Sequence, residues 1–393
     1  MHIAMYAPAL PSTGSANGIV TYARIMQAAL REAGHRVTVF DRFGIEYDDG
    51  RVEPVGPDTR LPARLRRAKE RVFGRPPTEW PVTFRHIIEK IHAAHPIDVL
   101  EIEESFGFAG RIGLGIPVVA RLHGPHIYGK DACEPPEIAR ISAARIVVER
   151  GSIADTAGVT CPSPKMMAAT LDHYGVSPVH AAPIYNPIPV ASPADTWSSA
   201  HCNPDQLLFV GRFDLRKGAD IMLRAFDLAL QRRPTLRLTM CGPDVGIVGD
   251  DGEARCFDDY SKLHLRSETQ KRIAYLGAVK PDRIRDLRLQ STLSVSTSRF
   301  EVLAYSLTEG LAAGMPILAS DTFGIAEIVE NRRNGFVAPV GDAAAVADAI
   351  VEALSDRARL AQVGAAGRDL CAGLLAPARI AAQTVDFYRA VIG

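Results

Sequence analysis

Short apolar runs alternate with amphipathic segments along the chain, with loops rich in glycine or proline between them. The run His2–Ala7 is followed by a loop and by Ile19–Ala33, in which apolar residues recur at helical spacing. Gly34 is expected to end this helix, and the run Val37–Phe40 follows it. This order predicts a strand–helix–strand unit, which requires a parallel sheet with right-handed crossovers.

The same order recurs in both halves of the chain. Further strands of the first half are expected at Val99–Ile102, Val118–Leu122 and Gly158–Cys161, and helices at Pro81–Ala94 and Ala139–Ala154. Strands of the second half are expected at Leu207–Val210, Leu236–Met240, Ile273–Leu276, Leu293–Ser296 and Pro316–Ala319, and helices at Ala219–Gln231 and Pro377–Ile392. We therefore predict an α/β protein with two tandem Rossmann-like domains, each a doubly wound parallel sheet, that face a cleft.

A proline-rich stretch without periodicity, Pro187–Pro204, separates the two halves. We expect an N-terminal domain at residues 1–188, a linker at 189–204 and a C-terminal domain at 205–374. The last helix, within residues 375–393, is apolar on one face and is expected to pack back on the N-terminal domain.

Composition narrows the class of protein. The 45 basic and 45 acidic residues give a formal net charge of zero, which argues against a general nucleic-acid binder. No run approaches the roughly 20 apolar residues of a membrane-spanning helix, and Met1–Leu10 has no basic region, so it is interpreted as a strand rather than a signal peptide. The six cysteines lack zinc-binding spacing, which favours reduced thiols in a cytoplasmic protein.

Two segments of the second half carry candidate chemistry. In the loop Gly211–Gly218, Arg212 and Lys217 lie between a strand and a helix N-terminus, a suitable place for a diphosphate, although a solvated basic turn has the same pattern. Glu301 and Glu309 are separated by seven residues. If that span is mostly helical, they lie roughly 12 Å apart on one side and can accept hydrogen bonds from sugar hydroxyls; an exposed acidic helix is the alternative.

Four further segments are weaker candidates. The segment Gly14–Gly18 resembles a phosphate-approach loop but lacks the dinucleotide and P-loop spacings, and its residues suit any tight turn. His123 follows a strand and could point into a cleft, although a lone histidine is more often structural. The turn Asp321–Glu327 could meet a phosphate or simply cap a helix. Glu101, Glu103 and Glu104 could face an acceptor or form a capped surface turn.

Taken together, these motifs resemble a known family. The segments VGRFDLRKG, Glu-seven-Glu, AAGMPILAS and EIVENRRNGFVAPVGD match in order and spacing the retaining GT-B glycosyltransferases of the family 4 type, also called glycosyl transferases group 1. The resemblance spans the whole chain and includes the Gly-rich first loop, His123-Gly124 and Tyr185-Asn186.

The resemblance implies roles for individual residues. It gives catalytic roles to Arg212, Lys217, Glu301 and His123, of which the two cations would hold the donor diphosphate and Glu301 would contact the donor sugar. Glu309 would bind the ribose hydroxyls. The full set that would bind the nucleotide sugar is Asn17, Gly18, Gly211, Leu303, Ala304, Tyr305, Glu309, Gly324 and Glu327. The family implies front-face transfer in which the departing phosphate takes the acceptor's proton, with no metal and no cofactor.

Three positions depart from the family pattern. Leu303-Ala304 replaces the usual Phe-Gly, Phe323-Gly324 the usual Gly-Gly, and Thr297 the usual proline. Because Ala304 adds a methyl group where backbone approaches phosphate, and Phe323 narrows the sugar pocket, the donor sugar is left open.

A basic segment suggests a membrane contact. Residues 60–75 contain seven basic residues and one acidic residue, with an apolar helical stripe. Such a segment can lie on an anionic bilayer, or it can be a solvated helix or a loop. We accordingly predict a cytoplasmic protein, with peripheral contact at the inner face of the cell membrane as a hypothesis.

The leading hypothesis for function is transfer of a sugar from a nucleotide diphosphate sugar, with UDP favoured over GDP, to a hydroxyl group. The acceptor could be a glycan, a lipid-linked molecule or a small molecule, and no nucleic acid is expected as a partner. A nucleotide-sugar epimerase and a catalytically silent sugar-nucleotide-binding partner remain alternatives, whereas the missing GxGxxG disfavours a nicotinamide-dependent dehydrogenase.

Overall fold

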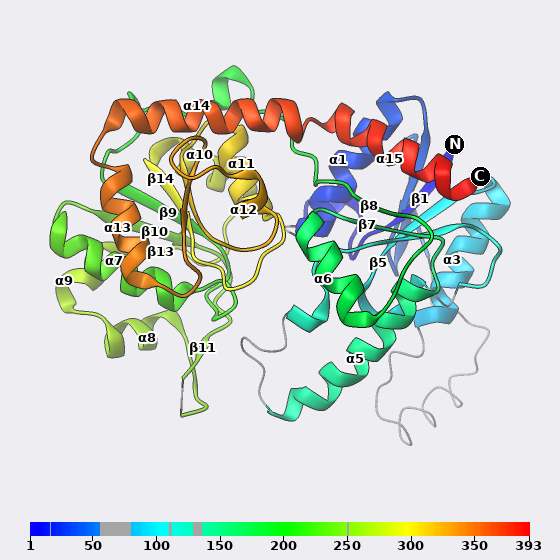
Figure 1. Cartoon of the computed structure of the whole chain (residues 1–393), viewed down its shortest axis with the longest axis horizontal. Helices are drawn as coiled ribbons and strands as arrows, with labels where there is room; N and C mark the ends of the chain where they lie inside the picture. Colours follow the sequence, from blue (N-terminus) through cyan, green and yellow to red (C-terminus); the bar gives the residue numbers. More distant parts are fainter. Residues whose placement is uncertain (16, 56–79, 110–111, 129–135, 250) are drawn as a thin grey trace. The chain divides into compact units, whose positions relative to one another are not determined.

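The computed structural model describes residues 1–15, 17–55, 80–109, 112–128, 136–249 and 251–393, which form two compact units (Figure 1). The first unit consists of Met1–His126, Arg140–Pro187 and Pro377–Gly393, and the second of Ile127–Ala139 and Ile188–Ala376. The basic segment 60–75 lies outside the described residues, so its membrane contact stays a prediction. Among the described helices, none is both long and apolar enough to cross a bilayer.

The first unit is built on a mostly parallel sheet with the strand order β4-β3-β2-β1-β5-β6-β7-β8. Its strands are β1 (His2–Tyr6), β2 (Arg36–Phe40), β3 (Gly44–Glu46), β4 (Val52–Pro54), β5 (Val99–Glu103), β6 (Val118–Arg121), β7 (Gly158–Cys161) and β8 (Ala181–Pro183). Its helices are α1 (Gly18–Glu32), α3 (Trp80–Ala94), α6 (Pro164–Tyr174), α15 (Pro377–Ile392) and most of α5 (Pro136–Ala154), with short 3-10 turns η1 (Pro11–Thr13) and η3 (Ser105–Gly107). The turn η5 (His126–Tyr128) and the start of α5 include residues of the segment Ile127–Ala139, which belongs to the second unit. Among the described strands of this sheet, β3 pairs antiparallel with both β2 and β4, and the other neighbouring strands pair parallel.

The second unit has a parallel sheet with the order β13-β10-β9-β14-β15-β16. Its strands are β9 (Gln206–Val210), β10 (Arg237–Cys241), β13 (Ile273–Tyr275), β14 (Leu293–Ser296), β15 (Ile317–Ser320) and β16 (Phe336–Ala338), beside a hairpin of β11 (Ile247–Val248) and β12 (Ala254–Arg255). Its helices are α7 (Ala219–Arg232), α8 (Phe257–His264), α9 (Ser267–Gln270), α10 (Pro281–Gln290), α11 (Tyr305–Ala312), α12 (Ile325–Ile328), α13 (Ala343–Ala353) and α14 (Arg357–Leu374), with η6 (Pro193–Asp195). The predicted α/β class with two parallel sheets is confirmed.

Successive side chains of β9 point to opposite faces of this sheet, and both faces are buried. Leu207 and Phe209 belong to a core cluster with residues of α7 and α13. Leu208 points the other way and packs in a second cluster with Trp197 and Leu287. A strand buried on both faces is typical of doubly wound folds, in which helices cover each side of a parallel sheet.

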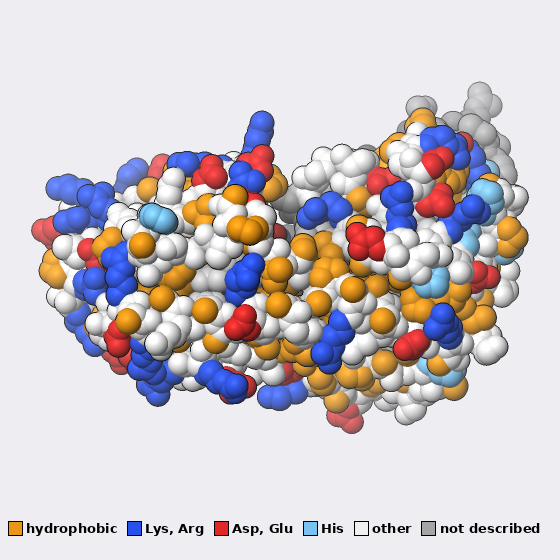
Figure 2. Space-filling model, turned by 90° about the horizontal axis from the view of Figure 1, so that it is seen from above, with side chains coloured by type: hydrophobic (Ala, Val, Ile, Leu, Met, Phe, Trp, Pro, Cys, Tyr) orange, Lys and Arg blue, Asp and Glu red, His pale blue; other side chains and the backbone are white. Residues whose placement is uncertain are grey.

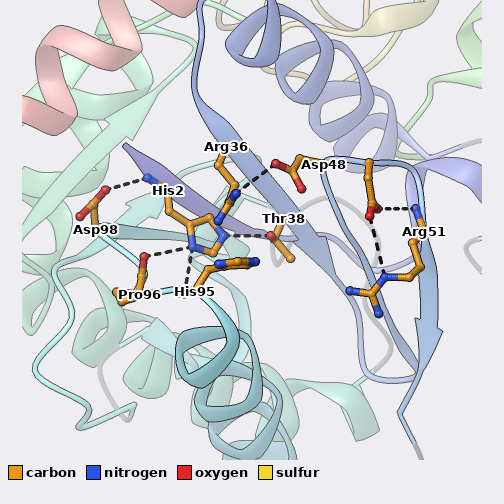
Figure 3. A network of polar contacts seen from close by, with 9 residues as sticks. His2, Arg36, Thr38, Asp48, Arg51, His95, Pro96 and Asp98 are labelled. Carbon is orange, nitrogen blue, oxygen red and sulfur yellow. Dashed lines mark hydrogen bonds and ion pairs between the residues drawn. The ribbon is translucent and has the colours of Figure 1, made fainter.

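The amino ends of the first sheet are fastened by a polar network around His2 (Figure 3). The His2 backbone N–H donates to Asp98 Oδ2 at 2.7 Å, and the ring Nδ1 lies 3.1 Å from the carbonyl oxygens of both His95 and Pro96. The ring Nε2 lies 2.9 Å from Thr38 Oγ1. Because two carbonyls face Nδ1, we infer that this nitrogen carries the proton. Burial lowers the pKa of His2, which keeps the ring neutral.

The helix α15 returns to the first unit and packs against α1 (Figure 1). Ile380, Thr384 and Tyr388 are buried in this contact face. A β-carbon on Gly158 would lie 2.9 Å from the Phe387 ring, so a glycine in β7 allows the helix to approach this closely.

The stretch expected as a linker, 189–204, is fastened to the second unit. The Trp197 indole N–H donates to the Ser291 carbonyl at 2.7 Å, and the Trp197 backbone N–H donates to Ala313 at 2.7 Å. The ring is 6% exposed. A buried aromatic residue and its two hydrogen bonds therefore hold this proline-rich stretch against the second unit.

Charged side chains of both signs are interspersed on the face shown in Figure 2. This view shows no large field of one sign, in keeping with the formal net charge of zero.

Candidate functional site

The strand order of the second sheet reverses between β9 and β14. In open α/β sheets, ligands bind beyond the carboxyl ends of the strands at such a reversal. The loop Gly211–Gly218 follows β9, and the loop Thr297–Ala304 follows β14. Both segments singled out in the sequence therefore lie at the place where this fold binds ligands.

These two loops are in direct contact through Gly218 and Thr297. Gly218 has a φ of 66°, and a β-carbon on it would lie 1.8 Å from the Thr297 carbonyl oxygen. The Thr297 hydroxyl donates to the Gly218 carbonyl at 2.7 Å. Proline, the usual residue of the family at position 297, has no hydroxyl to make this bond. Close packing thus requires glycine at 218, and the threonine locks the contact.

The contact brings three of the predicted residues together. Lys217 Nζ forms an ion pair with Glu301 Oε1, and both side chains are mostly buried. Arg212 pairs with Asp214 Oδ2 at 2.7 Å, while Asp214 Oδ1 accepts the backbone N–H of Lys217 at 2.7 Å. Asp214 therefore organises both cations, a role that the sequence analysis missed.

Gly211 marks the end of β9. Its N–H donates to the Cys241 carbonyl at 2.9 Å, and a β-carbon on Gly242 would lie 2.0 Å from the Gly211 carbonyl oxygen. The main chain of the loop thus begins in a fixed position beside β10.

The helical geometry expected between Glu301 and Glu309 is wrong. The helix α11 begins at Tyr305, and Ala304 precedes it with an extended backbone at φ −65° and ψ 123°. Glu301 therefore lies in the loop after β14, and only Glu309 lies on the helix. The separation and angle derived from a continuous helix do not apply to this pair.

Glu309 has a partner that the sequence analysis missed. Its Oε2 accepts from Nη2 of Arg288, which lies on α10, and the Arg288 side chain is 8% exposed against 36% for Glu309. The buried guanidinium thus fixes one carboxylate oxygen of a side chain that is open to solvent.

Gly324 lies against the loop after β14. It has a φ of 71°, and a β-carbon on it would lie 1.5 Å from the Val302 carbonyl oxygen and 3.3 Å from Leu303 Cβ. Leu303, Ala304 and Tyr305 are buried at the start of α11. The structure therefore brings together the predicted residues 303, 304, 305 and 324, while Glu327 lies half-buried on α12.

An aromatic cluster of the second unit borders the same loop. Phe300 stacks on Tyr128 with ring centroids 5.2 Å apart, and Phe323 lies edge-on to Tyr128 at 5.2 Å and to Phe300 at 6.2 Å. Phe323, which replaces a usual glycine of the family, is thus packed on other rings beside Glu301.

The predicted residues of the first unit lie on α1 and after β6. Asn17 caps α1, since its Oδ1 accepts the Ile19 N–H at 2.8 Å, and Gly18 is the first residue of the helix. The His123 ring lies edge-on to Tyr22 of the same helix, with centroids 5.1 Å apart. Burial and the nearby Arg121 guanidinium hold the pKa of His123 well below its usual range.

Two buried carboxylates hold the loop that carries His123. Glu104 accepts the backbone N–H groups of His123 at 3.0 Å and Gly124 at 2.8 Å, and Glu149 accepts that of His126 at 3.0 and 3.1 Å. Burial raises the pKa of Glu149 to about 8, with a further increase from Glu104.

The alternative of a capped surface turn for Glu101, Glu103 and Glu104 is wrong, because the first two lie on β5 and Glu104 directly follows it. Glu101, Glu103 and Glu104 are 3%, 7% and 1% exposed. Burial and the Glu104 charge raise the pKa of Glu103 to about 8. These side chains support the fold from inside. The sequence signal that could have indicated this, and that the sequence analysis did not use, is a charged residue within an apolar strand.

Two family models match consecutive parts of the chain. The family described as glycosyl transferases group 1 matches residues 196–370, and glycosyltransferase family 4 matches residues 16–192.

Curated relatives with glycosyltransferase names match the chain at low identity. A D-inositol 3-phosphate glycosyltransferase of Streptomyces avermitilis is 30% identical over 159 residues, which covers 40% of this chain and 34% of that protein. One of Pseudarthrobacter chlorophenolicus is 24% identical over 416 residues, covering 97% of this chain and 92% of the relative.

Solved structures share the fold over nearly the whole chain. Sucrose-phosphate synthase from Thermosynechococcus elongatus has a TM-score of 0.74 at 21% identity, with coverage of 99% of this chain and 98% of that one. Anabaena HepE in complex with UDP-glucose has a TM-score of 0.65 at 18% identity, covering 99% of this chain and 100% of that one.

Proposed function

Because the chain belongs to the GT-B glycosyltransferases of group 1 and family 4, we propose that it is a retaining enzyme using a nucleotide diphosphate sugar, with UDP favoured. It would move the sugar to a hydroxyl group of a glycan, a lipid-linked molecule or a small molecule. The observation that carries this proposal is the pairing of Lys217 with Glu301 beside Arg212, where the strand order reverses.

In this proposal, Arg212 and Lys217 bind the donor diphosphate. Their loop leads directly into α7, whose first N–H groups have no partner within the helix and attract negative charge. As the bond from sugar to phosphate breaks, negative charge grows on the departing diphosphate. Two fixed cations stabilise that charge, which lowers the barrier to transfer.

Glu301 would change its partner when the donor binds. In the structure its Oε1 holds Lys217 in place. An arriving diphosphate competes for the lysine, and the carboxylate then accepts hydrogen bonds from hydroxyls of the donor sugar. The ion pair thus keeps both side chains in position before the donor arrives.

The nucleotide end would be held by Glu309 and by main-chain groups. With Oε2 fixed by Arg288, the carboxylate of Glu309 is oriented to accept hydrogen bonds from the ribose hydroxyls. The loop around Leu303, pinned by Gly324, presents main-chain groups to the phosphates. Phe323 and Phe300 shape the sugar end and determine which donor fits.

His123 would border the transferred sugar, and Asn17 and Gly18 would approach the donor from the start of α1. A neutral imidazole suits this role, since it can exchange hydrogen bonds with sugar hydroxyls without adding charge. The departing phosphate oxygen would take the proton of the acceptor hydroxyl, so the chain needs no residue to act as general base.

A two-step experiment tests the proposal. Thermal unfolding is followed with UDP-glucose, other UDP-sugars and GDP-sugars, because a ligand that binds only the folded state raises its stability. Donors that stabilise the protein are then incubated with an acceptor panel that includes D-inositol 3-phosphate. A glycosylated product with retained anomeric configuration supports the proposal. Binding without turnover favours a silent partner, and isomerisation of the donor without an acceptor favours an epimerase.

A further inference from the structure

A buried carboxylate, Glu101, joins three elements of the first unit. Its Oε2 accepts from the Tyr388 hydroxyl of α15 at 2.7 Å and from the Tyr22 hydroxyl of α1 at 3.2 Å. Glu101 itself lies on β5. All three residues are buried, with exposed fractions of 3% for Glu101, 0% for Tyr388 and 2% for Tyr22. Inside a protein such bonds are strong because water does not compete for them.

Arg121 closes this network from the side of β6. Its guanidinium carbon lies 4.7 Å from the centre of the Tyr22 ring, a cation–π contact. Its Nη2 donates to the Ile184 carbonyl at 2.8 Å and to Asn186 Oδ1 at 2.9 Å. Tyr22 is therefore fixed at its hydroxyl by Glu101 and at its ring by Arg121.

The His123 imidazole packs against the ring of Tyr22. The two rings meet edge-on at an interplanar angle of 71°, with centroids 5.1 Å apart. Glu104 fixes the backbone of His123 through its N–H group, but a backbone bond does not set the plane of the ring. Within the described contacts, Tyr22 is the side chain that orients the imidazole.

We propose that Tyr388 is a positioning residue for His123. Its hydroxyl holds Glu101, Glu101 holds the Tyr22 hydroxyl, and the Tyr22 ring sets the plane of the imidazole. The catalytic consequence rests on the proposed function, in which His123 borders the transferred sugar. A change on α15 would then alter the chemistry at a strand end without touching the substrate.

The geometric part of the proposal is tested by NMR without any substrate. Histidine labelled with ¹³C at Cε1 gives one signal per ring, and His123→Gln identifies the signal of His123. Tyr388→Phe removes only the hydroxyl that holds Glu101, so the partner of the Tyr22 hydroxyl is no longer fixed and the ring-current shift of His123 should change. Tyr47→Phe is a matched control, because it removes another tyrosine–glutamate bond of the same unit, from Tyr47 to Glu53 at 2.8 Å.

An unchanged His123 signal in folded Tyr388→Phe overturns the proposal, as does an equal change in Tyr47→Phe. Circular dichroism establishes that each variant is folded. If Tyr388→Phe does not fold, Tyr22→Phe is used instead, because it removes the hydrogen bond from Tyr22 to Glu101 and leaves α15 unchanged. A changed His123 signal in that variant supports the proposal, and an unchanged one overturns it.

Kinetics test the catalytic consequence with UDP-glucose as the probe donor. Tyr388→Phe should lower kcat by about 10- to 100-fold, because a misplaced catalytic group costs about that much, with the KM for the donor unchanged. If Tyr388 were only structural, Tyr388→Phe would have a lower melting temperature and the same kcat as the wild type. A wild type that turns over no nucleotide sugar contradicts the proposed function, whereas the NMR result still decides the positioning of His123.

Discussion

Lys217 and Glu301 form an ion pair although they lie 84 positions apart in the chain. The two residues come from loops that follow neighbouring strands, β9 and β14, so the parallel sheet itself brings them together. In the proposed function, a diphosphate that displaces Glu301 would meet a lysine already in place.

Replacing Lys217 should therefore reduce transfer with the fold intact. Loss of one donor to the developing charge costs about 100- to 1000-fold in rate, so the turnover of Lys217→Ala should fall by that amount. The melting temperature should fall as well, because the mostly buried Glu301 carboxylate loses its partner, but the variant should remain folded. Turnover is measured with the donor found by thermal shift. The exposed Lys271→Ala of the same unit is the control and should keep wild-type turnover. Retained turnover in Lys217→Ala would rule out its role at the diphosphate.

Glu309→Ala should weaken binding of UDP. Hydrogen bonds to a charged group contribute about 1.5–3 kcal/mol, which corresponds to roughly a 10- to 100-fold rise in Kd. The variant should also lose stability, since it leaves the buried Arg288 without its carboxylate. Calorimetry on the folded protein measures the affinity. Glu330→Ala, which breaks the exposed pair with Arg333, is the control and should bind UDP like wild type. Equal affinity of Glu309→Ala and wild type would remove the ribose assignment.

Gly324→Ala should destabilise the second unit and displace the loop after β14. A left-handed backbone costs a residue with a side chain about 1–2 kcal/mol. At Gly324 the added β-carbon also collides with the Val302 carbonyl. Gly341→Ala separates these effects, because Gly341 has a φ of 80° but no atom within 4 Å of the added carbon. Urea unfolding should show a clearly larger loss for Gly324→Ala. A similar loss of unfolding free energy in both variants would mean that the loop after β14 shifts to accommodate the methyl group at little cost.

Stability should fall as the pH rises through the range in which Glu103 stays protonated. Burial holds its pKa at about 8 in the folded protein, against an ordinary value of 4.5. Between these values the unfolded chain releases its proton and the folded chain keeps it, so the free energy of unfolding decreases by up to about 1.4 kcal/mol per pH unit. Below pH 4.5 both states are protonated and the effect is absent.

Glu103→Gln removes this titration, so its melting temperature should decline less than that of wild type between pH 5 and 8. The exposed Glu32→Gln serves as the control and should follow the wild-type slope. Identical slopes for Glu103→Gln and wild type would show that Glu103 is ionised in the folded state.

Hydrophobic periodicity was sufficient to predict the central strands of both sheets and several of the helices. The helix over Pro377–Ile392 and the strands at Gly158–Cys161 and Leu293–Ser296 have the predicted bounds, because each has a clear apolar pattern and a clear end. The edge hairpin of β3 and β4 was missed, since three-residue strands contain too few positions to show a period.

The candidate site was less predictable than the fold, because its geometry depends on contacts between distant segments. The spacing of Glu301 and Glu309 suggested a helix, whereas α11 begins only at Tyr305. The partners Arg288 and Tyr388 come from elsewhere in the chain, and no local pattern connects them to their sites. Asp214 lies between Arg212 and Lys217 in the same loop, but its contacts with both depend on how that loop folds. A polar residue inside an apolar strand, such as Glu101 or Arg121, is the one local sign that a buried partner must exist.

The return of α15 to the first unit affects how the protein can be divided. A fragment that stops at Pro187 would contain the whole first sheet but would lack α15. The apolar face of α1 on which α15 packs would then be exposed, and the Glu101 carboxylate would lose its hydrogen bond from Tyr388. Such a half would be prone to aggregation despite its complete set of strands. Supplying residues 377–393 as a separate peptide, or joining them to Met1 through a permuted chain, should restore it. The second unit is continuous from Ile188 to Ala376 and takes only Ile127–Ala139 from the first half of the chain, so it does not depend on a distant terminal helix in this way.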